Sequence, residues 1–423
     1  MLDQPFQIMN LSEEEHDAFV KAHPYGDLLQ LCSWAKVKAP QWRSRRVAVG
    51  CGGQVVAVAS LLFRRLPFIG RTIAYVSRGF VCNYRNPEEV KAIFEAARQV
   101  AKEEKAILLK IDPEVRREGN EAVTESLKAL GFRHHGYTMG IADTQPRFTM
   151  VTPLAADIDT VVKRFTAGTR TLVKKSFKTG LVCERGGREQ LPQFIRLMEE
   201  TGVRDGFTTR ELSYFEKMAD ALGEDFALYL CRLDYPEALR QNTAATGALA
   251  AERRATVKKL EKSTDEQKKH SLSEAVEALD KRLAQLTEER REIEARAAGG
   301  EPCYLSASIL TFCGQRSYYL YSGSSNDLRQ CYPNYRMQWE LMSEAIRRGC
   351  ISYDFGGVSG YTDGSQDPGH AGLYEFKKKW GTEMVERIGE FDFVLSPFWY
   401  FMFSRALPAV KRRRKKGVSN AGI

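Results

Sequence analysis

The sequence contains few of the residues that build metal sites. It has nine cysteines and six histidines in 423 residues, and no two cysteines form a Cys-x-x-Cys pair. A tetrahedral zinc site needs clustered thiolate or imidazole ligands, so the dispersed pattern argues against a bound metal. We expect the cysteines to be buried or incidental thiols in a reducing cytosol.

Long apolar runs and a targeting segment are also missing. The N-terminal residues lack the basic stretch and apolar core of a signal peptide. No run of about 18 apolar residues occurs, so the sequence predicts a cytoplasmic protein without a membrane span. A glycine-rich pyrophosphate loop at a strand–helix junction is absent as well, which argues against binding of acyl-CoA.

The net charge of +9 is distributed unevenly. The segment 249–296 has twelve basic and eleven acidic residues, whereas 411–423 has six basic and no acidic ones. Only about +2 remains for the rest of the chain, so phosphate binding there must depend on a few placed residues. The basic tail at 411–423 is expected to contact a polyanion. The aromatic run at 397–403 before it suits either an anionic membrane interface or a buried terminal element.

Apolar patterning predicts a mixed α/β fold. Alternating residues at 46–50 and 54–63 indicate two strands joined by a turn. A predicted helix at 87–104 leads to a buried strand at 106–111. Strands and helices follow in a similar order between 148 and 355, although no residue-level repeat relates the halves. The length is enough for two or three units with their own cores.

A charged helical hairpin at about 248–297 is the clearest structural prediction. A polar turn at 263–271 separates two helical segments, which can then pair antiparallel. A dimerising coiled coil is the alternative, but two seams on either side of one turn favour a hairpin within the chain. Apolar residues recur with heptad spacing in the second segment at Leu272, Val276, Leu279, Leu283, Leu286 and Ile293.

Four stretches carry motifs that recur together in one enzyme family, in order over about residues 25–400. The stretches are Leu29-Gln30 with Trp34 to Lys38, Leu109 to Pro113, Tyr318 to Asn326 with Tyr353 to Gly357, and Gly372 to Gly381. Together they resemble the Fem family of peptidoglycan aminoacyltransferases, some of whose members also carry a helical arm. Ser77 to Phe80 depart from the family's Pro-Arg-Gly-Pro, which bears on how the acceptor is contacted.

The resemblance implies two tandem acetyltransferase-like domains of the GNAT type, an α/β (α+β) fold with an antiparallel coiled-coil arm inserted. On this basis we expect a first domain at 1–147, completed by about 385–410, and a second domain at 148–384. The arm at 248–297 interrupts the second domain, and a basic tail occupies 411–423.

The same resemblance implies transfer of an amino acid from aminoacyl-tRNA to the stem peptide of a peptidoglycan precursor. The acceptor is lipid II or UDP-MurNAc-pentapeptide, and the arm and the aromatic and basic end favour lipid II. Gly, Ala and Ser stay open as the amino acid. No cofactor is expected, because an aminoacyl ester is already activated and the amine needs only positioning and proton removal. We also expect peripheral contact with an anionic membrane through the tail.

Three cations are the expected contacts to phosphate and ester. By resemblance, Lys36 corresponds to a lysine that contacts the acceptor's pyrophosphate. Arg210 and Tyr214 match an Arg-x-x-x-Tyr motif on one face of a helix. Lys377 corresponds to a lysine that stabilises charge developing on the ester oxygen or holds the tRNA end. Simpler readings stay open, since Lys36 also suits a helix surface and Lys377 has two lysines beside it.

Two tyrosines and an aspartate complete the expected site. Tyr319 and Tyr321 alternate with Leu320, so strand geometry predicts both phenols on one side, lining a polar cleft or half-buried. Asp112 ends a strand before Pro113 and is a candidate general base or a cap of the following turn. Proton transfer assisted by the substrate is an equal contender.

Two other functions stay open. An acyl-CoA-dependent N-acyltransferase on the same fold predicts the pyrophosphate loop that the sequence lacks. A non-enzymatic coiled-coil scaffold at the membrane predicts that the arm is needed for activity and that Lys377 is dispensable. The sequence does not define the oligomeric state.

Overall fold

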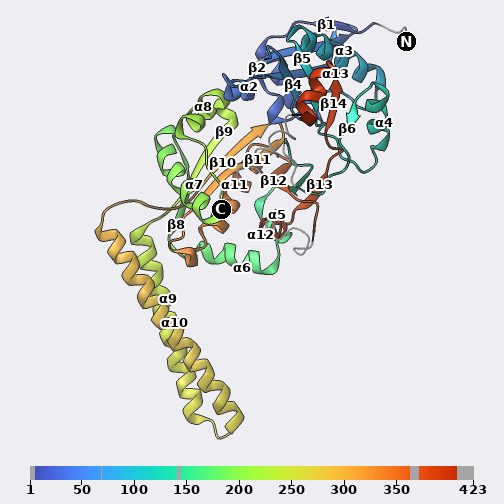
Figure 1. Ribbon diagram of the computed structural model, residues 1–423. Helices are drawn as coiled ribbons and strands as arrows, with labels where there is room; N and C mark the ends of the chain where they lie inside the picture. The colour runs from blue at the N-terminus through green and yellow to red at the C-terminus, as the bar shows by residue number, and fades with distance from the viewer. Residues whose placement is uncertain (1–4, 68, 141–143, 363–370, 407–423) are drawn as a thin grey trace, which may run out of the picture.

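The computed structural model describes residues 5–67, 69–140, 144–362 and 371–406. In this part of the chain, two seven-stranded sheets form the cores of two bodies that pack together. Figure 1 shows the body that contains the N-terminus above the second body, from which a long helical hairpin projects. Over the same residues, no helix has both the length and the apolar character that a membrane crossing requires.

The first sheet is assembled from both ends of the chain. Its order is β1-β2-β3-β4-β5-β14-β6, and only β4 and β5 are parallel neighbours. Its strands are β1 (Gln7–Met9), β2 (Arg43–Cys51), β3 (Gln54–Arg65), β4 (Thr72–Val76), β5 (Ala106–Ile111), β14 (Phe391–Val394) and β6 (Arg133–His134). Its helices are α1 (Glu13–Ala22), α2 (Cys32–Lys38), α3 (Pro87–Glu103) and α4 (Glu121–Ala129). The helix predicted at 87–104 therefore forms, with Asn86 capping the backbone N–H of Glu89 and proline in its first turn.

The second sheet is built from residues 148–386. Its order is β13-β7-β12-β11-β10-β9-β8, and β11 and β12 are its parallel pair. Its strands are β13 (Glu383–Glu386), β7 (Phe148–Pro153), β12 (Ser352–Val358), β11 (Arg316–Ser324), β10 (Cys303–Cys313), β9 (Phe226–Leu233) and β8 (Leu181–Gly186). Its helices are α5 (Ile158–Lys163), α6 (Ala167–Ser176), α7 (Leu191–Asp205), α8 (Leu212–Leu222), α11 (Pro333–Arg347) and α12 (Ala371–Lys378).

The last strands of the chain join the two bodies. Strand β13 pairs with β7 in the second sheet, and β14 then pairs with β5 and β6 in the first. A core of apolar side chains also crosses the interface, with Trp34 and Val58 from the first body and Phe194, Phe215 and Ile309 from the second. The interface is therefore held by main-chain pairing at one edge and by buried apolar area within.

The two parallel strands of the second sheet separate along their length. Pairing between β11 and β12 joins Arg316–Tyr318 to Ser352–Asp354, although β11 continues to Ser324 and β12 to Val358. Where two parallel strands diverge, their backbone N–H and C=O groups no longer pair with each other. In α/β sheets, ligands commonly bind at such places near the carboxyl ends of the strands. The sequence motifs at 318–326 and 353–357 lie on these two diverging segments.

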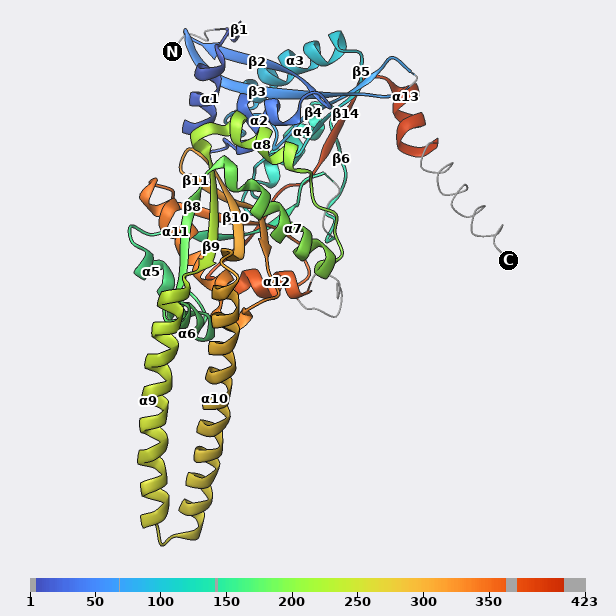
Figure 2. The ribbon, with the colours of Figure 1, turned by 90° about the vertical axis from the view of Figure 1, so that its left-hand side faces the viewer.

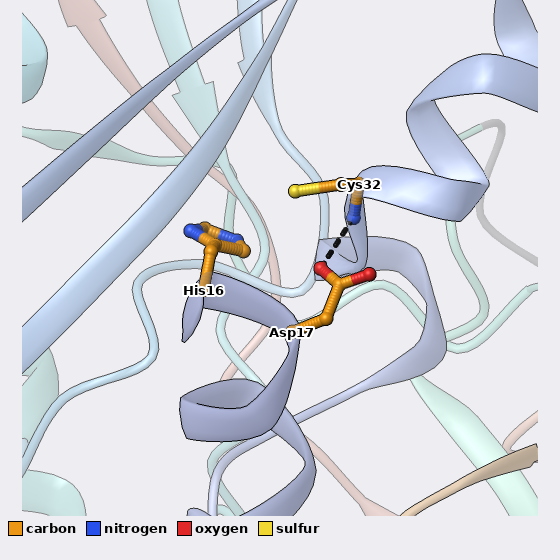
Figure 3. Close-up of side chains that lie close together, drawn as sticks. All are labelled: His16, Asp17 and Cys32. Atoms are coloured by element: carbon orange, nitrogen blue, oxygen red, sulfur yellow. Dashed lines mark hydrogen bonds between the residues drawn. The ribbon is translucent and has the colours of Figure 1, made fainter. Parts of the chain in front are cut away.

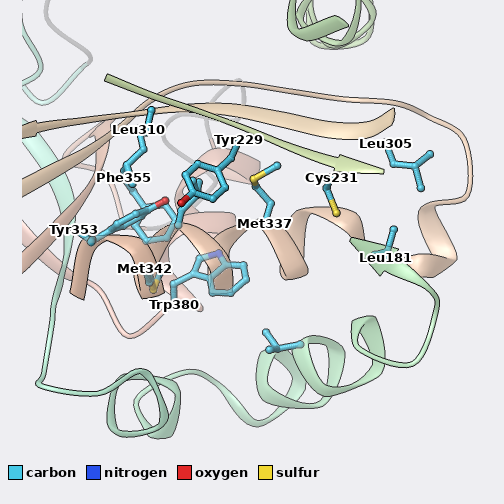
Figure 4. Close-up of a cluster of buried hydrophobic side chains, with 14 of the residues drawn as sticks. Leu181, Tyr229, Cys231, Leu305, Leu310, Met337, Met342, Tyr353, Phe355 and Trp380 are labelled. Atoms are coloured by element: carbon cyan, nitrogen blue, oxygen red, sulfur yellow. The ribbon is translucent and has the colours of Figure 1, made fainter. Parts of the chain in front are cut away.

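Trp380 anchors the segment that follows α12 in the second core. Its ring is fully buried, 5.2 Å from the ring of Phe165 and 6.2 Å from that of Phe355, measured between centroids. Figure 4 shows it beneath Phe355 and Tyr353 within the buried cluster. Burial of a large aromatic ring fixes the end of α12, and thereby the position of Lys377 three residues earlier.

The arm consists of α9 (Tyr235–Lys262) and α10 (Glu266–Ala298), which run side by side away from the second body (Figure 2). The first helix begins well before the predicted start near 248, and the turn is shorter than predicted because Asp265 caps α10 at once. Leu286 and Ile293 are buried, whereas the seam residues nearer the tip are half-buried. The side-chain amide of Asn242 also donates to the Leu286 carbonyl at 2.9 Å. Packing is therefore tightest at the base.

The prediction that all cysteines are thiols is wrong for one pair. Cys183 and Cys231 form a disulfide between β8 and β9, where they lie directly opposite each other in the antiparallel register. They are 48 residues apart in sequence, so no local spacing marks them as partners. The pairing follows from strand neighbours that the sequence did not reveal.

Replacing Leu286 by alanine should loosen the base of the arm. Removal of a buried leucine side chain costs about 2–5 kcal/mol, so backbone amides of α9 and α10 near Leu286 should exchange hydrogen faster. The matched control is Leu272→Ala, near the tip, where the side chain is half-buried and the loss should be smaller. Equal effects of the two substitutions would show that the seam does not tighten toward the base.

Candidate active site

A cluster of basic and phenolic side chains lies where α2 meets α8 and β11. The Lys38 ammonium donates to the Tyr214 hydroxyl at 3.2 Å and lies 4.5 Å from the ring centre of Trp34. The Tyr214 hydroxyl is also 3.5 Å from that of Tyr321, and the Arg210 guanidinium lies over the Tyr214 ring. The cluster thus joins residues of both bodies.

Burial and neighbouring charge alter the ionisation of this cluster. Burial, with Arg210 nearby, lowers the pKa of Lys38 to about 8. Burial and the neighbouring Tyr321 hydroxyl raise the pKa of Tyr214. Lys38 is therefore mostly cationic at neutral pH and Tyr214 stays a neutral donor, a combination suited to an anionic ligand.

Lys36 and Lys38 point to different surroundings. Lys36 is exposed and forms an ion pair with Glu13 at 2.6 Å, and Glu13 also pairs with Arg46 at 3.2 Å. The sequence analysis singled out Lys36, whereas the structure brings Lys38 into the cluster with Tyr214. The helical period held a usable signal, because Lys38 lies four residues after the buried Trp34 and so shares its inward face.

Arg210 and Tyr214 meet, although not as one face of a helix. Helix α8 begins at Leu212, so Arg210 precedes it. The guanidinium nevertheless lies 5.5 Å from the ring centre of Tyr214. The predicted proximity is confirmed, and the predicted helical position of Arg210 is wrong.

The prediction that Tyr319 and Tyr321 share one side of a strand is wrong. Ile309 of β10 pairs with Tyr321, and the next residue, Leu310, pairs with Tyr319, which leaves Leu320 as the extra residue of a bulge. A bulge breaks the alternation of side chains. Tyr319 accordingly packs with Tyr353 and Phe355 in the second core, whereas Tyr321 packs with Phe215 at the interface.

Lys377 lies buried at the diverging end of β12. Its ammonium donates to the Gly357 carbonyl at 2.7 Å, and only 6% of the residue is exposed. Burial lowers its pKa to about 8, against the opposing effect of Asp354. Lys378 is exposed, so the three consecutive lysines do not form one solvated run. Gly356 has a φ of 79°, a backbone conformation that favours glycine at this position beside Lys377.

Asp112 is buried beside a cavity of about 270 Å³. Its Oδ1 accepts from the Tyr75 hydroxyl at 3.0 Å and from the Arg78 backbone N–H at 2.8 Å. Its Oδ2 has no hydrogen-bond partner among the described residues. Burial raises its pKa to about 7, although Arg78 opposes the shift. A carboxyl with a pKa near 7 can accept and release a proton near neutral pH, which suits a general base.

The turn that carries Arg78 is strained. Arg78 has a φ of 60°, in the region that side chains other than glycine disfavour, and Gly79 follows with a φ of 73°. A Cβ at Gly79 would lie 2.5 Å from the Tyr84 hydroxyl and 2.7 Å from Pro113. The sequence Ser77-Arg78-Gly79 thereby directs both the backbone N–H and the guanidinium of Arg78 toward Asp112.

Gly357 and Pro146 pack closely together between Lys377 and this cavity. Gly357 accepts the Lys377 hydrogen bond, and a Cβ on Gly357 would lie 2.5 Å from the Pro146 side chain. Pro146 lines the cavity beside Asp112, and its carbonyl accepts from the Arg78 guanidinium at 3.3 Å. Pro146 therefore lies between the Asp112 cavity and the strand end that holds Lys377.

Buried ion pairs join the two halves of the site. Arg387, in the segment between β13 and β14, pairs with Glu114 of the first body and lies 3.9 Å from Asp354 of the second. Arg78 and Arg316 each lie 3.6 Å from Glu114. Burial raises the pKa of Glu114, but these arginines outweigh it and leave the pKa well below its usual range. None of these ion pairs was predicted, because the partners are distant in sequence.

His16, Asp17 and Cys32 form a compact group of potential metal ligands (Figure 3). Each already has a structural contact. The His16 ring Nε2 lies 3.0 Å from the Gln30 carbonyl, and the Cys32 backbone N–H donates to the Asp17 carboxylate at 2.7 Å. Burial and the Asp17 carboxylate raise the pKa of the Cys32 thiol to about 12, which disfavours the thiolate. These contacts dock α1 against the start of α2.

The comparisons with known proteins agree with this architecture. The model of the FemAB family matches residues 11–407. Lipid II:glycine glycyltransferase of Staphylococcus aureus strain MSSA476 is 41% identical over 414 residues, covering 96% of this chain and 97% of that protein. The protein of the same name from strain bovine RF122 is 40% identical over the same length. The crystal structure of FemX matches with a TM-score of 0.80 at 41% identity, covering 94% of this chain and 99% of that one.

Two acetyltransferase-like sheets packed together in one chain define a protein of the tandem GNAT-like class. Within that class, the chain belongs to the FemAB family. The resemblance drawn from the four sequence motifs and the fold class that it implied are both confirmed.

Lysine side-chain NMR should separate the buried lysines from the exposed one. Lys38 and Lys377 should titrate near pH 8 because burial disfavours their charge, whereas the Glu13 ion pair raises the pKa of Lys36. Lys38→Met and Lys377→Met assign the two signals by removing one each. Titration of all three lysines together above pH 10 would contradict the burial of the two sites.

Proposed function

We propose that the chain transfers glycine from glycyl-tRNA to the stem peptide of lipid II, in synthesis of the peptidoglycan interpeptide bridge. The observation that carries this proposal is 41% identity over 96% of the chain to a lipid II:glycine glycyltransferase. The buried, cationic lysine at the diverging strands and the separate basic cluster support it, because they offer one site for an ester and another for phosphate.

The acceptor's pyrophosphate binds at the cluster of Lys38, Arg210, Tyr214 and Tyr321. Two cations and two phenols there present donors to an anion from both bodies of the molecule. Lys36, on the outer face of α2, serves as a further cation only if the Glu13 pair opens. Tyr319 packs with Tyr353 and Phe355 in the second core, next to the point where β11 and β12 separate, so its role is to support that strand end.

The reaction joins an amine of the stem peptide to the aminoacyl carbonyl. The amine attacks the ester carbon, the C–N bond forms, and negative charge develops on the carbonyl oxygen. The Lys377 ammonium stabilises that charge. Its side chain needs to move little during the reaction, because the hydrogen bond to the Gly357 carbonyl already holds it in position. The C–O bond to the ribose then breaks, and the departing ribose oxygen takes a proton.

The proton lost by the attacking amine passes to Asp112 or directly to the departing oxygen. Asp112 offers an oxygen without a hydrogen-bond partner among the described residues and a pKa of about 7. Both features suit a base that accepts a proton and returns it. Direct transfer between the substrates needs neither feature, so substitution of Asp112 distinguishes the two routes.

Two other functions receive less support. An acyl-CoA-dependent N-acyltransferase lacks its glycine-rich pyrophosphate loop in this sequence. A coiled-coil scaffold gives no reason for burying Lys377 and Asp112, at a cost in solvation, beside a cavity.

Purified protein should transfer labelled glycine from glycyl-tRNA to lipid II. Alanyl-tRNA and seryl-tRNA serve as competing donors, acetyl-CoA as the control donor, and UDP-MurNAc-pentapeptide as the second acceptor. Product is measured by chromatography of the labelled precursor. If none of the three charged tRNAs donates its amino acid to either acceptor, the proposed function is wrong.

The Lys377→Met variant tests the chemistry within the same assay. Loss of a charge-stabilising group should slow transfer by about 100-fold or more. Lys377 is charged below its pKa of about 8, so the ratio of wild-type to variant rates should be largest there and shrink at higher pH. A ratio that grows above pH 8 would mean that the neutral amine acts instead.

The pair Lys38→Met and Lys36→Met tests which face of α2 binds the acceptor. Loss of a charge-assisted hydrogen bond costs about 1.5–3 kcal/mol, so Lys38→Met should raise the KM for lipid II by roughly tenfold or more. Lys36→Met removes an exposed ion pair and should change KM by less than about threefold. The reverse ranking would place the pyrophosphate on the outer face of α2.

A further inference from the structure

One end of the first sheet gathers basic side chains. Arg43 begins β2, Arg65 ends β3, Arg71 precedes β4 and Lys105 precedes β5. Backbone hydrogen bonds hold these ends together, from Leu66 N–H to the Arg71 carbonyl at 2.8 Å and from Thr72 N–H to the Lys105 carbonyl at 3.3 Å. The four basic residues line one shallow cavity of about 720 Å³.

Only part of this charge is neutralised. Arg43 pairs with Glu104, and Arg45 pairs with Glu103 and Glu104. Among the described residues, no acidic side chain pairs with Arg65, Arg71 or Lys105. The end of the sheet thus carries an excess of positive charge in a protein whose remaining body is close to neutral.

An exposed aromatic helix lies beside this basic end. Helix α13 (Pro397–Phe401) follows β14, and the Leu395 and Ser396 N–H groups both donate to the Ile107 carbonyl at 3.0 Å, near the start of β5. Helix α13 packs against β5, the strand that Lys105 precedes. Phe398 is 65% exposed and Phe401 57% exposed.

This helix is held against the sheet while its apolar side chains face water. The Tyr400 hydroxyl donates to the Asp392 carboxylate at 3.2 Å, and the Arg133 guanidinium lies over the Tyr400 ring. Tyr400 therefore anchors the helix, leaving Phe398, Phe401 and the partly exposed Met402 outward. Exposed aromatics beside unpaired arginines are typical of surfaces that contact a bilayer, where rings enter the interface and arginines meet headgroups.

We propose that this end of the first sheet, formed by Arg65, Arg71, Lys105, Phe398 and Phe401, docks on an anionic lipid bilayer. A nucleic acid would match the charge but not the outward phenylalanines of α13. A second copy of this chain would have to bring together two surfaces with the same excess positive charge. A bilayer with acidic headgroups complements both the charge and the apolar side chains.

The location of the docking face fits a lipid-linked acceptor, and this argument rests on the proposed function. Lys38 of the basic and phenolic cluster precedes Arg43 by five residues, a span of at most about 17 Å. Strand β4 leads away from the same end toward Arg78 and Asp112 and covers about 17 Å over its five residues. The phosphate cluster and the Asp112 cavity thus both lie within roughly 20 Å of the docking face, within reach of a lipid-linked acceptor.

Co-sedimentation of the full chain with vesicles tests the docking face without any reaction. Vesicles of phosphatidylcholine with phosphatidylglycerol should bind the wild type, and vesicles of phosphatidylcholine alone should bind it far less. The double variants Phe398→Ser/Phe401→Ser and Arg65→Glu/Arg71→Glu should each weaken binding tenfold or more. Matched controls are Ile351→Ser, an exposed apolar residue of the second body, and Arg254→Glu on the arm.

Every variant retains the basic tail, so a difference reports the folded face. Unchanged vesicle binding in both double variants overturns the inference. Two other results also overturn it. One is a double variant that binds vesicles normally but has lost affinity for tRNA. The other is a wild-type dimer, detected by light scattering, that the double variants no longer form. Transfer to membrane-embedded lipid II should fall in the double variants while transfer to soluble UDP-MurNAc-pentapeptide stays unchanged. Vesicle binding without transfer to either acceptor would refute the proposed function and leave the docking face standing.

Discussion

The buried ion pair of Arg387 with Glu114 sets how the two bodies meet at the candidate site, within an interface otherwise held by main-chain pairing and apolar packing. Arg387 is 4% exposed and lies between a strand of the second sheet and a strand of the first. Its charge needs a partner from each body, Glu114 on one side and Asp354 on the other. Breaking such a pair leaves an uncompensated buried charge, which costs several kcal/mol. The relative position of the bodies is therefore fixed where the cavity beside Asp112 and the strand end at Lys377 adjoin.

Burial lowers the pKa of Lys38 and of Lys377 by a similar amount. Lys38 and Lys377 both have a pKa of about 8, so each is mostly charged at neutral pH yet poorly solvated. A poorly solvated cation interacts strongly with an arriving anion, because less water must be displaced. Under the proposed function, Lys38 meets the acceptor's phosphate and Lys377 meets the charge that develops during the reaction.

The sequence was sufficient for features encoded by local periodicity. The strand at 106–111 and the helix starting at Pro87 follow from apolar patterning and capping, and the heptad from Leu272 to Ile293 defined the arm. Family membership and the fold class followed from motif order. Features that depend on neighbours distant in sequence were missed. The bulge at Leu320 places the side chains of Tyr319 and Tyr321 on different sides of β11. The Cys183–Cys231 disulfide depends on the pairing of β8 with β9. Lys38 was recoverable from its helical register with Trp34, whereas the partners of Arg387 were not.

The path of the chain through β13 and β14 has a consequence for biogenesis. The first sheet lacks β14 until residue 394 has left the ribosome, although all its other strands are made within the first third of the chain. During synthesis the β5 edge remains unpaired and exposes backbone groups that invite wrong pairing. The arm, whose helices pair locally, folds early by comparison. The first sheet is therefore completed only at the end of translation, when β14 pairs with β5 and β6.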